Sequence, residues 1–246
     1  LITENIKMKN DSMIKGHVAI VTGASSGIGY ATALAIAKAG AKVAISARRT
    51  DKLEQLKKEI EKNGGECIIV PCDVSKKSDC DKLIDETVKK WGRLDILVNN
   101  AGLMPLSFVK SLKVEEWDKM VDVNIKGVLY CTAASVPHFI KQNSGHIVNI
   151  SSVAGRVVFP AGSVYCATKY AVRAFSEGLR QELSVRHNIR VTTIEPGVVD
   201  TELTNTITDK ALESFVKYAK EMKALKSEDI ANSIVFALES PPHMNV

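Results

Sequence analysis

Tyr165 and Lys169 stand four residues apart at the start of a segment whose apolar pattern predicts a long helix. Residues at this spacing lie on one face of a helix. A nearby cation favours the phenolate and lowers the pKa of a tyrosine from its usual value of about 10, so the pair could exchange a proton near neutral pH. The pair therefore indicates general acid–base chemistry, although tyrosine and lysine are also common on helix surfaces.

Two serines, Ser151 and Ser152, follow the apolar run at residues 147–150, and Ser152 precedes Tyr165 by thirteen residues. The run predicts a strand buried on both faces of a parallel sheet. Doubly wound sheets bind ligands at the carboxyl ends of their strands. The serines are therefore expected at a ligand-binding edge.

A glycine-rich turn at residues 22–29 follows the first apolar run and opens directly into an apolar helix. Glycines there allow a tight turn and close approach of the backbone to a pyrophosphate, and the helix N-terminus supplies N–H donors. The spacing is G-x-x-x-G-x-G, and the alternative is a turn that binds nothing. Its position favours a dinucleotide site that includes Gly23, Ser25, Ser26, Gly27, Ile28 and Gly29.

Arg48 and Arg49 follow the second apolar run, where NAD-binding folds place an acid that bonds the ribose 2′-hydroxyl. A guanidinium matches a 2′-phosphate in charge and in fork geometry, so NADP is the expected cofactor. Arg48 is expected to be the main contact, with help from Ser25 or Ser26. The alternative is that both arginines only face solvent.

Short β-branched runs alternate with amphipathic segments along the chain. They predict strands at 17–22, 42–47, 66–71, 94–99, 146–150 and 189–194, and helices at 27–39, 51–62, 76–90, 114–141 and 164–185, with two more after residue 206. Pro137 is expected to kink or end its helix. The alternation predicts a single-domain α/β Rossmann fold, a doubly wound parallel sheet flanked by helices on both faces.

Composition excludes several classes of protein. The chain has 246 residues, 45% of them hydrophobic, which excludes disorder. The net charge is +5, but basic and acidic residues are interleaved along the helices predicted at 51–62 and 76–90. This pattern indicates solvated helix faces rather than a nucleic-acid surface. The five cysteines form no C-x-x-C pair, so neither a disulfide framework nor a metal site is expected.

Residues 18–37 carry no formal charge over about the length of a bilayer span, but a small polar, glycine-rich break at 22–27 interrupts them. No membrane segment is therefore expected. The first fifteen residues are polar and contain no signal-peptide run, which predicts a cytoplasmic protein with a flexible leader at 1–15 before the domain at 16–246.

Taken together, these motifs resemble the short-chain dehydrogenase/reductase family over nearly the whole chain, in its NADP-preferring branch. The matching positions, in the family's order, are residues 22–29, Asp73, residues 99–102, Asn124, Ser152, Tyr165 with Lys169, and Pro196-Gly197. Because the family usually closes its sheet with a further strand, the domain at 16–246 is expected to lack that final strand.

The resemblance implies a role for each matching residue. Tyr165 would be the general acid or base, Ser152 would bond the substrate oxygen, Lys169 would hold the nicotinamide ribose and lower the pKa of Tyr165, and Asn124 would fix a water that links Lys169 to solvent. The remaining cofactor residues would be Asp73 at the adenine, with Val74 beside it, Asn100, Ala101 and Gly102 at the ribose, and Pro196, Gly197, Val199 and Thr201 near the nicotinamide.

The implied function is NADP(H)-dependent hydride transfer to or from a small ketone, aldehyde or hydroxy acid, in a homotetramer or homodimer. Substrate contacts are expected from residues 103–108, residues 153–162 and the segment after Thr201. Arg156 is the one candidate anchor for an anionic substrate, unless it faces solvent. The alternatives are a non-catalytic NADP(H) sensor and, from net charge alone, a polyanion-binding protein.

Overall fold

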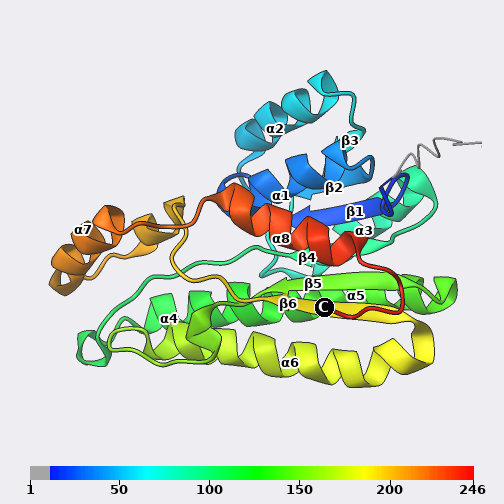
Figure 1. Ribbon diagram of the computed structural model, residues 1–246. Helices are drawn as coiled ribbons and strands as arrows, with labels where there is room; N and C mark the ends of the chain where they lie inside the picture. The colour runs from blue at the N-terminus through cyan, green and yellow to red at the C-terminus, as the bar shows by residue number, and fades with distance from the viewer. Residues whose placement is uncertain (1–11) are drawn as a thin grey trace, which may run out of the picture.

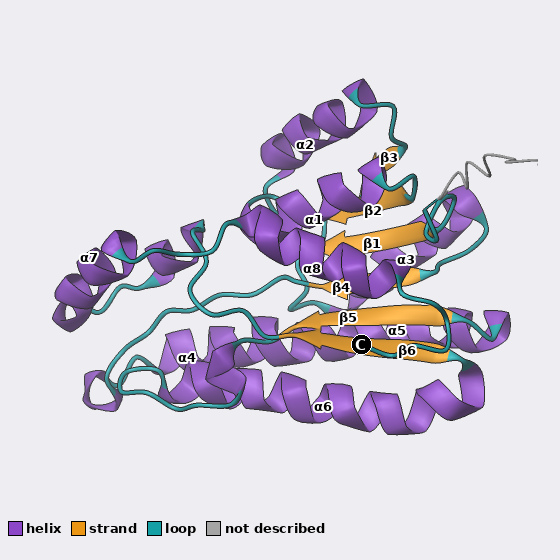
Figure 2. Cartoon of the chain, viewed as in Figure 1, coloured by secondary structure: helices purple, strands orange, loops and turns teal. Residues whose placement is uncertain are grey.

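The computed structural model describes residues 12–246. These residues form one six-stranded sheet in the order β3-β2-β1-β4-β5-β6, and all neighbouring strands are parallel. The strands are β1 (Val18–Thr22), β2 (Lys42–Ser46), β3 (Cys67–Ile69), β4 (Ile96–Asn99), β5 (Gly145–Ile150) and β6 (Ile189–Ile194) (Figure 2). The predicted doubly wound fold is confirmed, and its strand order reverses between β1 and β4.

Helices cover both faces of the sheet (Figure 1). One face carries α1 (Gly27–Lys38), α2 (Thr50–Lys62) and α8 (Ser227–Glu239), and the other carries α3 (Lys77–Trp91), α5 (Gly127–Gln142) and α6 (Ser163–His187). This arrangement explains why β1 is apolar from Val18 to Val21. Ala19 and Val21 pack on the first face, while Val18 and Ile20 pack on the second.

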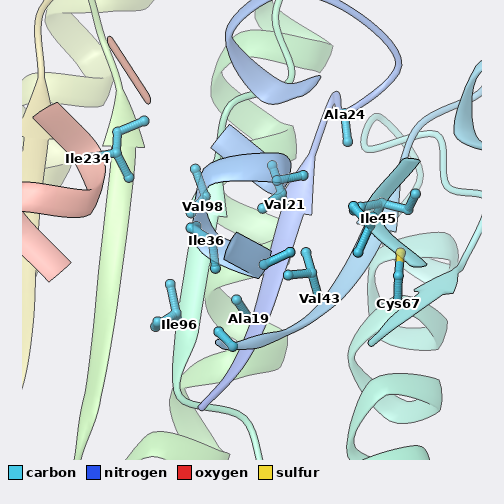
Figure 3. Packing of buried hydrophobic residues seen from close by; sticks show 14 of the residues in the cluster. Ala19, Val21, Ala24, Ile36, Val43, Ile45, Cys67, Ile96, Val98 and Ile234 are labelled. Atoms are coloured by element: carbon cyan, nitrogen blue, oxygen red, sulfur yellow. The ribbon is translucent and has the colours of Figure 1, made fainter. Parts of the chain in front are cut away.

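The core on the first face is built from small and β-branched side chains. Figure 3 shows residues of β1, β2 and β4 gathered near Ile36 of α1. All the strand residues in this group are buried. Such a core holds the strands at fixed positions, so the loops at their carboxyl ends start from rigid supports.

The helix predicted at residues 114–141 is divided into three consecutive segments. They are α4 (Val114–Met120), a π-helical segment η2 (Val121–Lys126) and α5. Of the two outcomes predicted for Pro137, a kink or an end of the helix, the second is wrong, because α5 continues to Gln142. It stops at Asn143, whose left-handed backbone (φ 50°) is a common helix terminus.

Beyond β6 the chain leaves the sheet and returns as α8, so the two helices predicted after residue 206 are confirmed. It forms two short 3-10 segments, η4 (Glu202–Thr206) and η5 (Lys210–Leu212), and then α7 (Glu213–Glu221). Figure 1 shows α7 standing away from the sheet at the left. The segment is tied to the loop after β4, since Thr206 Oγ1 accepts from Met104 N (3.2 Å) and Asp209 Oδ2 accepts from Phe108 N (3.2 Å).

The predicted flexible leader at 1–15 extends too far along the chain. Residues 1–11 lie outside the described part, but Ile14 is 1% exposed and belongs to the core beside α1. A turn fixes this point, because Lys15 N donates to Ser12 O (3.1 Å). Over residues 12–246 no helix has both the length and the apolar character needed to cross a membrane.

Candidate active site

A cleft of about 840 Å³ opens at the carboxyl edge of the sheet, where the loops after β1, β4, β5 and β6 meet. This is the edge at which doubly wound sheets bind ligands, next to the point where strand order reverses. Every predicted site residue lines the cleft except Gly29 and Asn124. The structure thus brings the glycine turn, the two arginines and the Ser–Tyr–Lys group together around one space.

The glycine turn after β1 is packed against the loop after β4. A methyl group on Gly23 would lie 2.8 Å from Ala101 Cα, and one on Gly29 would collide with Gly23 O and the Asn100 side chain. Asn100 Nδ2 donates to Thr22 O (2.9 Å) and Gly23 O (3.2 Å). Asn100 therefore holds the turn in shape, and only glycine fits at positions 23 and 29.

The first turn of α1 is open toward the cleft. Helix α1 begins at Gly27, whose φ of 56° favours glycine, and Ser26 at the N-cap forms no side-chain bond to the helix backbone. The N–H groups of a first helical turn have no partner within the helix and attract anions. A close backbone and these donors fit the pyrophosphate of a dinucleotide.

The predicted catalytic side chains Ser152, Tyr165 and Lys169 are brought together by β5 and α6. Lys169 Nζ donates to Ile150 O at the end of β5 (2.9 Å) and lies 5.8 Å from the centroid of the Tyr165 ring. Ser152 Oγ donates to Pro196 O (3.3 Å) and accepts from Ala154 N (3.1 Å). These contacts fix the serine and the lysine close to the phenol, which is hydrogen-bonded to Ser152.

Burial sets the ionisation of the tyrosine and the lysine. It raises the pKa of Tyr165 to about 12, against a smaller lowering by its hydrogen bond with Ser152. It lowers the pKa of Lys169 to about 8. The net pKa of Tyr165 is thus raised, with no effect of Lys169 among the causes, and the lowering expected from Lys169 stays a prediction.

Asn124 lies in the π-helical segment and is 1% exposed. Its Oδ1 accepts from Leu103 N (2.9 Å), while its Nδ2 donates to Leu103 O (2.9 Å) and Thr168 Oγ1 (3.2 Å). Thr168 Oγ1 in turn donates to Tyr165 O (2.7 Å). The side chain thus joins the loop after β4 to the helix that carries the tyrosine. π-Helical turns often occur at functional sites, but the sequence pattern did not reveal this one.

The two arginines after β2 differ in their surroundings. Arg49, rather than Arg48, contacts the serines of the glycine turn: its Nη2 donates to Ser25 Oγ (3.0 Å) and Ser26 Oγ (2.8 Å). Its Nη1 pairs with Glu202 Oε2 at 2.8 Å. Glu202 lines the cleft, and sequence reasoning missed it because nothing in its neighbourhood marks an acid after Thr201 as a partner of Arg49.

The other end of the cleft is apolar. Its lining includes Leu103, Met104, Leu106, Val153, Phe159, Leu203 and Phe215, together with the polar residues Thr204, Asn205 and Thr206. All three predicted substrate segments contribute. Phe215 comes from α7, whose strongly one-sided apolar pattern was the available signal for it.

Arg156 does not line this cleft. Its guanidinium pairs with Glu195, which also lies 3.5 Å from Arg173 Nε, and Tyr170 donates a hydrogen bond to its carbonyl. The suggestion that Arg156 anchors an anionic substrate is therefore wrong for this arrangement. Glu195 thus pairs with Arg156 and Arg173 rather than with the catalytic residues.

A parallel sheet with a glycine turn at its switch point and a Ser–Tyr–Lys group beside it defines a dinucleotide-binding oxidoreductase. Residues 17–212 match the family model described as short chain dehydrogenase. The chain belongs to the short-chain dehydrogenase/reductase family.

Individual relatives agree with this assignment. An uncharacterized oxidoreductase of Staphylococcus saprophyticus is 46% identical over 235 residues, covering 95% of this chain and 94% of that protein. A serine dehydrogenase in its closed form with NADP⁺ matches with a TM-score of 0.85 and 35% identity, covering 93% and 92% of the two chains. A family member from Burkholderia phymatum in complex with NAD has a TM-score of 0.85 and 27% identity, covering 92% and 86%.

Proposed function

We propose that the protein is an NADP(H)-dependent oxidoreductase that moves a hydride between the nicotinamide and a small carbonyl compound or secondary alcohol. The observation that carries the proposal is the convergence of Ser152, Tyr165 and Lys169 in a cleft whose other end is the glycine turn. A protein that only sensed NADP(H) would need the turn but not this acid–base group. A catalytic function is therefore favoured over that of a non-catalytic NADP(H) sensor.

The proposed chemistry gives a separate role to the cofactor and to each of the three side chains. When bound, the cofactor supplies the hydride. Ser152 donates a hydrogen bond to the substrate oxygen and stabilises the charge that develops there. Tyr165 gives its phenolic proton to that oxygen, and the Lys169 ammonium stabilises the phenolate left behind. Its raised pKa keeps Tyr165 protonated at neutral pH, which is the state required of the acid in carbonyl reduction.

Asn124 is proposed to hold a water that links Lys169 to solvent. A methyl group at Gly102 would lie 3.4 Å from Asn124 Oδ1 and 3.9 Å from Lys169 Nζ, so both polar atoms face the same small space. The other cofactor contacts are proposed as the resemblance implies them, at Asp73, Val74, Ala101, Gly102, Pro196, Gly197, Val199 and Thr201.

NADP is proposed over NAD because a cation and two hydroxyls, those of Arg49, Ser25 and Ser26, gather at the adenosine end of the cleft. This set suits a phosphate better than a ribose hydroxyl. The serine dehydrogenase with bound NADP⁺ supports this preference, whereas the Burkholderia protein with bound NAD shows that the fold accepts either cofactor.

The substrate is proposed to be an uncharged ketone or aldehyde rather than a hydroxy acid. The wall around Met104, Phe159 and Leu203, with the neutral polar residues Thr204, Asn205 and Thr206 beside it, offers no cation to a carboxylate, and burying a charge without a countercharge is costly. Arg156, the one cation predicted there, is engaged with Glu195 outside the cleft. This differs from the serine named for the serine dehydrogenase.

A matched pair of substrates tests this proposal. NADPH oxidation is followed with ethyl acetoacetate and with acetoacetate, which share the ketone and differ in charge. The expected kcat/KM is about tenfold or more higher for the neutral ester, as the loss of an unpaired buried charge requires. Faster turnover of the acid would contradict the substrate class, and no NADPH oxidation with any small ketone or aldehyde would contradict the function itself.

The protein is further proposed to act in the cytoplasm as a homodimer or homotetramer. Helices α4 to α6 and the π segment between them leave several apolar side chains exposed, including Val121, Leu129, Ile140 and Val185. Exposed apolar groups on long helices are suited to burial against a second copy.

A further inference from the structure

The adenosine end of the cleft already contains an anion supplied by the chain itself. Glu202 Oε2 lies 2.8 Å from Arg49 Nη1, and the same guanidinium donates from Nη2 to both serines of the glycine turn, Ser25 (3.0 Å) and Ser26 (2.8 Å). The carboxylate thus pairs with the same cation, Arg49, that was assigned to the cofactor 2′-phosphate, and it is also hydrogen-bonded to Ser26.

The backbone places Glu202 against the glycine turn. Thr201 caps the short η4 segment, with its Oγ1 accepting from Leu203 N (3.3 Å). A methyl group on Gly27 would lie 3.0 Å from Thr201 Cγ2, so residue 202 follows directly from a point of close packing on that turn. The carboxylate therefore reaches Arg49 from a fixed anchor and not from a free loop.

Several cations surround this carboxylate, but they are not equivalent. Hydrogen bonds from Arg49 and Ser26 are the main causes that lower the pKa of Glu202, with a weaker effect of Lys52. The charge of Arg48 is among the causes that lower the pKa of Asp73 and is not among those that act on Glu202. Glu202 is thus ionised at neutral pH, and Arg49 is its direct partner.

A bound 2′-phosphate and Glu202 would compete for one guanidinium. Both are anions, and a guanidinium fork binds either a carboxylate or a phosphate through its paired N–H groups. With both present, the two negative charges would lie close together and divide the hydrogen bonds of the one Arg49 guanidinium, which is unfavourable. NAD has a neutral hydroxyl at this position, which does not compete with Glu202 for Arg49.

We propose that Glu202 is a specificity-determining residue that occupies Arg49 in place of the 2′-phosphate and so weakens the discrimination of the protein for NADP(H) over NAD(H). This inference rests on the proposed NADP(H)-dependent function. The Glu202–Arg49 pair closes the adenosine end of the cleft, and binding of NADP(H) requires Arg49 to change partners. Binding of NAD(H) leaves the pair in place.

The test compares Glu202→Gln with the wild type in binding of NADPH and NADH, followed by cofactor fluorescence at one ionic strength. Glutamine keeps the size of the side chain and removes its charge. Because an exposed ion pair contributes little, the expected change is an affinity for NADPH about fivefold tighter, with NADH changed by less than about twofold. Glu213→Gln, an exposed acid at the start of α7, is the control for net charge and should change neither.

Two further measurements assign the effect to the phosphate and to Arg49. Adenosine 2′,5′-bisphosphate should bind the Glu202→Gln variant more tightly than the wild type, while adenosine 5′-monophosphate should not. In an Arg49→Met background the same glutamine substitution should lose most of its effect, because the guanidinium for which the two anions compete is gone.

Weaker NADPH binding by Glu202→Gln would overturn the inference, since it would mean that the acid orients Arg49 for the phosphate. An unchanged NADPH-to-NADH ratio, or a full effect that persists in the Arg49→Met background, would also overturn it. These outcomes leave the proposed function intact, because the wild type would still bind NADPH. A wild type that binds neither dinucleotide would refute both.

Discussion

Tyr165 and Lys169 are both buried, at 5% and 7% exposure, and burial moves each toward its neutral form. For the tyrosine this means a retained proton and readiness to act as an acid. For the lysine it means that the ammonium is protonated at neutral pH but close to its titration range, because its pKa is about 8. The charge of Lys169 is therefore the more sensitive of the two to pH.

Reduction by the wild type should depend on pH through this lysine. A lowered pKa means that the ammonium is present below about pH 8 and is lost as pH rises through that value. We expect kcat/KM with NADPH to be level below pH 8 and to fall above it, since this parameter reports on groups of the free enzyme.

Lys169→Arg is the control for this profile, because arginine stays protonated over the whole range. Its activity should be lower than that of the wild type but should not fall near pH 8. A wild-type profile that remains level to pH 10 would show that Lys169 is not the group that limits reduction.

At the scale of the elements, the apolar runs were enough to predict six strands and most helices, since each strand is covered on both faces. The carboxyl-edge site followed from the same pattern, as Gly23 and Ser152 come just after a strand and Tyr165 lies in the first turn of the next long helix. The π-helical segment around Asn124 could not be predicted, because its i, i+5 bonding leaves no mark in an apolar period. The Arg49–Glu202 pair joins residues distant in sequence and needed the three-dimensional structure.

The glycine turn gives a test at this scale. Gly29→Ala places a methyl group against Gly23 O and Asn100, so we expect a loss of about 1–3 kcal/mol in the free energy of unfolding and weaker NADPH binding. Thermal unfolding and cofactor fluorescence measure the two effects.

Gly178→Ala is the matched control, because a methyl group on Gly178 within α6 meets nothing within 4 Å. This change should raise stability by about 0.5–1 kcal/mol and leave NADPH binding unchanged. If both variants behaved alike, close packing of the turn would not be what requires glycine at position 29.

For the molecule as a whole, the sheet edge and the segment from η4 to α7 enclose one cleft with two chemically different ends. The adenosine end has the cation and hydroxyls of Arg49, Ser25 and Ser26, and the far end has an apolar wall. Tyr165 lies where the loops from β5 and β6 meet the loop after β4. Under the proposed function, a dinucleotide would occupy the first end and a small carbonyl compound the second, in direct contact for hydride transfer, with Tyr165 beside the carbonyl oxygen.

The most direct test is turnover by Tyr165→Phe compared with the wild type, with NADPH affinity measured on the same samples. Phenylalanine fits the buried space and removes only the hydroxyl. We expect NADPH to bind within about twofold of the wild type while kcat for ketone reduction falls by about 100-fold or more, the usual contribution of a positioned proton donor. Turnover within about tenfold of the wild type, with NADPH bound normally, would contradict Tyr165 as the acid.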